Sequence, residues 1–151
     1  AIPLWARFLD RAHVVKFRSI HGWVFAVATA LFALGCWLHQ MPLLYAGAAM
    51  MGVGFGGGTL AWNLGHVDFA PPTQLSQYMA THVSLNGLRG LTAPLLAVGA
   101  YEWLGRRGLA HDHAAAVVLA ASFALCIVGT AGFVWLRIAM GPAGENKSRT
   151  A

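Results

Sequence analysis

Charged side chains are scarce in this chain of 151 residues: they make up 10% of it, whereas a typical soluble domain has about 25%. Hydrophobic residues make up 58%, and the mean hydropathy is +0.60. This composition excludes a disordered chain, which has few hydrophobic residues and many charges, and it argues against a soluble domain. The 18 glycines follow no triplet period, which excludes a collagen-like chain. The sequence therefore predicts a membrane protein, with the lipid bilayer as its main partner.

Acidic residues are fewer than basic ones, with 5 Asp and Glu against 10 Lys and Arg, and the net charge is +5. A basic protein could bind nucleic acid, but these basic residues do not form a stripe on one polar face. They flank apolar runs instead, which is the pattern of a membrane protein. We expect no nucleic-acid partner.

The sequence also has few groups that carry chemistry. Its two cysteines, Cys36 and Cys126, lie inside apolar runs and are interpreted as small buried hydrophobic residues. No nucleophile stands beside a base, and the His111-Asp112-His113 triplet is a weak metal signal. We therefore predict no enzyme activity, no metal and no cofactor. The sequence starts at Ala1 without Met, and its charged first 18 residues contain no signal-peptide core, so we expect a fragment or a processed piece.

Four hydrophobic runs predict an all-α bundle of four transmembrane helices, since about 20 helical residues cross the hydrocarbon core. The predicted helices cover residues 19–38, 42–64, 83–104 and 114–136. A cytoplasmic loop (1–18), a cytoplasmic loop with a helical extension (65–82), an outer loop (105–113) and a cytoplasmic tail (137–151) connect and flank them. The third run also carries Arg89 and Glu102, so an amphipathic helix on the membrane surface is the competing interpretation.

The basic residues set the expected orientation. On one side, the N-terminal segment and the tail together contribute seven: Arg7, Arg11, Lys16, Arg18, Arg137, Lys147 and Arg149. The other side receives only Arg106 and Arg107. We therefore predict a multi-pass protein of the cell's inner membrane with both termini in the cytoplasm.

Small residues in the runs predict close helix packing. The second run contains two interleaved Gly-xxx-Gly pairs, Gly52 with Gly56 and Gly54 with Gly58. In lipid, such residues let helix backbones approach closely, although lining a substrate path is an alternative role. In the third run, Pro94 removes one helix hydrogen bond and is expected to kink the helix.

Polar residues gather near the inner ends of the second and third runs, where they predict a polar gate. An arginine at mid-membrane costs about 2.5–3.5 kcal/mol, so Arg89 either snorkels to the surface or is buried with a partner. Asp68 is the predicted partner within this chain. The full set of expected gate residues is Asn63, His66, Asp68, His82, Asn86 and Arg89.

Three segments resemble the major facilitator superfamily of transporters, in the region of spans nine to twelve. Asp10-Arg11 before the first run is similar to the superfamily's loop motif, although Ala6 stands in place of the usual glycine. Gly90-Leu91-Thr92-Ala93-Pro94 is similar to its proline pattern in span five, whose counterpart is span eleven. The segments 62–70, 78–79 and 87–90 look like bacterial members with unassigned substrates.

The resemblance implies the C-terminal part of a secondary active transporter that moves a small solute by alternating access. The expected partners are the missing N-terminal spans and a small-molecule substrate. One alternative is a four-helix b-type cytochrome with His21 and His82 as axial ligands. Another is a small four-span assembly or scaffold protein, complete in itself.

Overall fold

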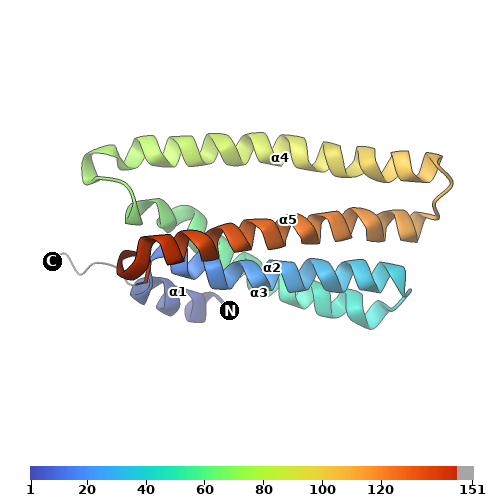
Figure 1. Ribbon diagram of the computed structural model, residues 1–151, viewed down its shortest axis with the longest axis horizontal. Helices are drawn as coiled ribbons and strands as arrows, with labels where there is room; N and C mark the ends of the chain where they lie inside the picture. Colours follow the sequence, from blue (N-terminus) through green and yellow to red (C-terminus); the bar gives the residue numbers. More distant parts are fainter. Residues whose placement is uncertain (146–151) are drawn as a thin grey trace.

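The computed structural model describes residues 1–145, and every regular element in that range is a helix (Figure 1). The predicted all-α class is therefore confirmed. The long helices are α1 (Ile2–Arg11), α2 (Val14–Trp37), α3 (Met41–Leu64), α4 (Leu75–Arg106) and α5 (His111–Met140). Three 3-10 turns are η1 (Gly65–Asp68), η2 (Pro72–Gln74) and η3 (Gly141–Gly144). Lys147 and Arg149, two of the residues behind the predicted orientation, lie outside the described residues.

Three of these segments are long and apolar enough to cross a membrane: Val14–Trp37, Met41–Asp68 and His111–Ala143. The chain is therefore a membrane protein. Helix α4 has the length but not the apolar composition, since its 32 residues include Arg89, Glu102 and Arg106.

Helices α2, α3 and α5 form the packed body of the molecule. Helix α2 lies between α5 and α3 and contacts both along its length. At the closest approach to α5, a Cβ atom added at Gly22 would lie 2.3 Å from Thr130 Oγ1. Helix α4 runs beside α5 (Figure 1), touches the body at few points and has no buried residue.

The N-terminal segment corrects the prediction of a loop over residues 1–18. Pro3 lies in the first turn of α1, where a missing backbone N–H is tolerated, and Leu9 on its inner face is buried. Ala12 is extended and ends α1, and His13 caps α2 by accepting a hydrogen bond from the Val15 N–H at Nδ1, 3.2 Å away. Helix α2 therefore begins at Val14 and not at Ser19, because a cap rather than the last charged residue sets its start.

Helix α1 lies against the middle of α3 and not beyond its end. Trp5 Nε1 donates a hydrogen bond to the Val53 carbonyl at 2.9 Å, and the Trp5 ring packs on His21 and Phe17. Val53 is half-way along the 24 residues of α3. The first turns of α1 therefore lie beside the middle of α3, although Ile2 and Leu4 are exposed.

The glycines of α3 differ in the element that each one faces. Gly54 and Gly58 face the Phe25 ring of α2, and Gly56 faces the start of α1. A Cβ atom at Gly57, which lies outside both predicted pairs, would come within 2.7 Å of the His21 ring. Gly52 has nothing within 4 Å, so its predicted packing role finds no neighbour in residues 1–145.

Candidate functional site

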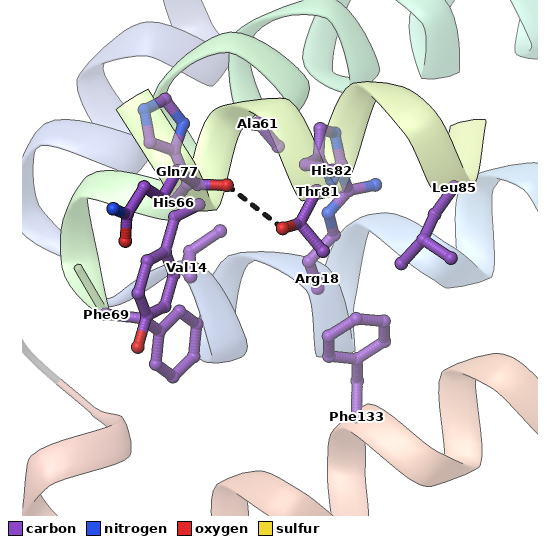
Figure 2. Close-up of a pocket in the computed structure, with 12 residues that line it drawn as sticks. Val14, Arg18, Ala61, His66, Phe69, Gln77, Thr81, His82, Leu85 and Phe133 are labelled. Atoms are coloured by element: carbon purple, nitrogen blue, oxygen red, sulfur yellow. Dashed lines mark hydrogen bonds between the residues drawn. The ribbon is translucent and has the colours of Figure 1, made fainter. Parts of the chain in front are cut away.

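Two adjoining cavities open between α4 and the packed body. The larger, here called the His82 cavity, has a volume of about 720 Å³. It is lined by Val14, Arg18, Ala61, Gly65, His66, Phe69, Gln77, Tyr78, Thr81, His82, Leu85 and Phe133 (Figure 2). These residues come from α2, α3, η1, α4 and α5, so every long helix except α1 contributes a wall.

The smaller, here called the Arg89 cavity, has a volume of about 480 Å³ and lies further along α2. It is lined by Arg18, His21, Gly22, Phe25, Met51, Phe55, Trp62, Arg89, Cys126, Gly129, Thr130 and Phe133. Phe25 is the twelfth of the 24 residues of α2, so this cavity reaches the middle of that helix.

Arg18 and Phe133 line both cavities and stand between them. Figure 2 shows Arg18 reaching from α2 toward Thr81 and His82 of α4, and Phe133 pointing from α5 toward the same space. The Arg18 side chain is partly buried. It lies close enough to both His82 and Arg89 to interact with them electrostatically.

The two histidines of the predicted gate both reach the His82 cavity. His82 Nε2 accepts a hydrogen bond from Asn86 Nδ2 at 3.0 Å, one helical turn away. His66 Nδ1 is buried and has no hydrogen-bond partner within residues 1–145. The wall of this cavity therefore includes a histidine with a buried, unsatisfied nitrogen as well as a histidine–amide pair.

Arg89 has a different partner from the one expected. Its guanidinium lies over the Trp62 ring, 5.6 Å from the centroid, and faces the Arg89 cavity. Asp68 Oδ2 accepts the Val14 N–H at 2.7 Å and so stabilises the first turn of α2. The structure thus gives Arg89 a cation–π contact with α3 and Asp68 a helix-capping contact with α2.

The remaining expected residues lie outside the two cavities. Asn63 Nδ2 donates to the Thr59 carbonyl at 2.8 Å on the exposed side of α3. Asp10 and Arg11 are exposed at the end of α1. Pro94 lies inside α4, which continues through it as one helix to Arg106.

His21 and His82 do not form the pair of axial ligands that a b-type cytochrome needs. His21 Nε2 donates a hydrogen bond to the Gly54 carbonyl at 2.7 Å, and its ring is enclosed by Trp5, Phe17 and Phe25. His21 is 1% exposed. Its nitrogen is thus committed to the α2–α3 contact.

At the opposite end of the bundle, the α2–α3 and α4–α5 turns meet through polar contacts. His39 Nε2 contacts Asp112 Oδ2, and the Tyr101 hydroxyl pairs with His111 Nδ1 at 3.0 Å. In the part of the chain that the structure describes, no three His, Cys, Asp or Glu side chains gather as a metal site would require. These contacts hold this end of the helix bundle together.

Arg18 is the residue of the site that the sequence pattern did not reveal. It was interpreted as a flanking charge because it precedes the uncharged run that begins at Ser19. Histidine is not one of the usual N-cap residues, so the sequence carries no strong signal for a helix start at His13. A helix start at Val14 puts Arg18 one turn inside α2, on the same side as Gly22 four residues later.

No protein-family model, curated protein or solved structure matches this chain.

Proposed function

We propose that this chain is the C-terminal part of a secondary transporter of the major facilitator type, with α2 to α5 as four membrane-spanning helices. The observation that carries the proposal is the pair of cavities. They are lined from four helices, they reach the middle of α2, and they contain arginine and histidine side chains. Transporters of this architecture bind solute near the midplane between their helices.

The path of the chain supports α4 as the fourth span. Helix α3 ends beside the start of α2, because Asp68 caps Val14. Helix α5 begins at the other end of α2, where Trp37 packs on His113. If α2, α3 and α5 cross the membrane, the segment between α3 and α5 must cross it too. At about 1.5 Å per residue, the 32 residues of α4 exceed the roughly 30 Å of hydrocarbon.

The unequal packing supports a gating role for α4. Helices α2, α3 and α5 share close contacts through small residues, whereas α4 touches the body at few points. A loosely packed element can shift between two positions at low free-energy cost. Movement of α4 would open or close both cavities, because His82 and Arg89 are on it while Arg18 stays on α2.

The position of α1 agrees with a larger helical assembly. Its first turns pack at the level of Val53 and Gly56 in α3, inside the span and not at its end. The complete reading frame should then encode about eight additional hydrophobic spans upstream, since two halves of six spans make the full transporter.

The functional test replaces Arg89 with Ala in the full-length transporter. We expect slower uptake and an altered balance between inward and outward accessibility, because the guanidinium bridges α4 to Trp62 of α3. Arg107→Ala is the matched control, since its guanidinium also lies over a tryptophan, Trp103, but away from both cavities. Unchanged uptake and accessibility in Arg89→Ala would reject the gate.

A further inference from the structure

None of the five carboxylate side chains of this chain lines either of the two cavities. Glu102 pairs with Arg106, Asp112 with His39, and Glu145 with both Lys16 and Arg137. Asp68 caps α2, and Asp10 is exposed at the end of α1. None of the five is a lining residue of either cavity. The cavities therefore contain cationic groups and no acidic side chain from this chain.

Two guanidinium groups face this space without a carboxylate. Arg18 and Arg89 both line the Arg89 cavity, and they are close enough for their like charges to repel each other. Neither forms an ion pair within residues 1–145. His82 lies in the field of both arginines and of His66, so the positive potential extends through the neighbouring cavity.

The contacts within this chain do not offset the free-energy cost of placing Arg89 at membrane depth. A cation–π contact at an exposed site contributes about 0.5–1 kcal/mol, whereas an arginine at membrane depth costs about 2.5–3.5 kcal/mol. The Trp62 contact therefore offsets only a minor part of the free-energy cost of placing Arg89 in the membrane. The repulsion from Arg18 adds to this cost, and an anion between the two guanidinium groups would add an attraction to each of them.

The geometry points to a small organic anion as the solute: we propose that Arg18 and Arg89 together bind its carboxylate or phosphate group in the Arg89 cavity. This inference rests on the proposed transport function. Guanidinium groups match the planar, bidentate geometry of these anions. Apart from His21 and Thr130, the rest of the cavity wall is largely apolar, with Phe25, Phe55 and Phe133 among its residues. Such walls favour a solute with an apolar or aromatic body over inorganic phosphate.

His66 gives the neighbouring cavity a second polar contact. Its buried Nδ1 is without a partner, and a buried polar atom in that state is unfavourable by about 1–3 kcal/mol. A polar substituent on the solute, carried at the end opposite its anionic group, could satisfy this atom as the solute passes Arg18. The two cavities would then be successive positions along one path.

The test measures binding by the full-length protein in a non-ionic detergent, with benzoate and phenyl phosphate as probes and benzamide as the neutral analogue. We expect both anions to bind and benzamide not to bind. Arg18→Gln and Arg89→Gln should each weaken anion binding roughly tenfold or more, because each removes one charged hydrogen-bond partner. Arg89→Lys should restore part of the affinity, and Arg107→Gln should bind like the wild type. Size-exclusion and circular dichroism profiles identify any variant that misfolds.

Several outcomes would overturn the inference. Equal binding of benzamide, or unchanged affinity in both Gln variants, would show that charge does not select the ligand. If phosphatidylglycerol added to the micelles bound and neither probe did, the arginines would serve a lipid headgroup. Uptake of a neutral or cationic solute into proteoliposomes without anion binding would also overturn it and leave the transport function standing. Anion binding without any uptake would instead reject transport and leave the anion site standing.

Discussion

At the scale of single residues, Gly57 is one of the tightly packed glycines of the α2–α3 contact. A Cβ atom there would lie 2.7 Å from the His21 ring and 3.0 Å from the Trp5 ring. His21 cannot move away freely, because Nε2 donates to the Gly54 carbonyl. We expect Gly57→Ala to lower the free energy of unfolding by about 1–3 kcal/mol, as overpacking of a filled core does. Thermal unfolding in detergent measures the change.

Gly52 supplies the matched control for this substitution. It lies in the same helix, five residues earlier, and a Cβ atom there would meet nothing within 4 Å. Gly52→Ala should leave the melting temperature unchanged or raise it slightly, since alanine is the better helix former. Equal losses of stability in both variants would mean that helix propensity, and not the contact with His21, determines the effect of the substitution.

The sequence predicted where small residues occur but not which of them are in contact. The Gly-xxx-Gly spacing located a close approach along α3, and Gly54 and Gly58 do face Phe25. It gave no reason to separate Gly52 from Gly57, because the direction of the neighbouring helix decides which glycine is covered. Arg18 was missed for a related reason: a run without charges marks the apolar part of a span and not the start of its helix.

At the scale of elements, Glu145 connects the end of α5 to the start of α2. Its carboxylate lies 2.6 Å from Arg137 Nε and 2.9 Å from Lys16 Nζ. These partners, Arg137 first, lower the pKa of Glu145 from 4.5 to about 2. Because the folded-state pKa is lowered, the contribution to stability is complete above pH 4.5 and is lost as the pH falls toward 2.

We therefore expect the η3 turn to stay in contact with α2 across the whole neutral and mildly acidic range. A spin label at the exposed Ala143 should keep its mobility down to pH 4.5 and become more mobile only as the pH approaches 2. Glu145→Gln should give the mobile spectrum already at about pH 7. Glu102→Gln breaks an ion pair at the other end of the bundle and is the control. A mobile label in the wild type at about pH 7 would contradict the contact.

The helices were predicted correctly where the composition of a segment alone determines its structure. The apolar runs predicted helices at the places where α2, α3 and α5 lie, because a long apolar segment in lipid must satisfy its backbone hydrogen bonds internally. The prediction failed for residues 1–18, whose charges indicated a loop, although Leu9 and Phe17 are buried on one side of α1 and α2. In residues 1–18, the spacing of the apolar residues was a better signal of helix than the number of charged residues.

At the scale of the whole molecule, the order of the helices determines on which side each connection lies. The α3–α4 connection adjoins the start of α2, whereas the α4–α5 connection adjoins its end. Thr73 and Ala110 are exposed residues of these two connections, and Ala143 is exposed beyond α5. If α4 crosses the membrane, Thr73 and Ala143 share one side and Ala110 is on the other.

Single cysteines at these three positions test that arrangement in the full-length protein, with Cys36 and Cys126 replaced by serine. A membrane-impermeant maleimide applied to intact cells should label Ala110→Cys. Thr73→Cys and Ala143→Cys should react only after the membrane is opened, because the basic residues favour the cytoplasmic side for both. If α4 lay on the membrane surface, Thr73 and Ala110 would react from the same side. Arg89 would then be at the interface, where an arginine needs no anion, so this labelling result decides whether the two cavities lie within the membrane at all.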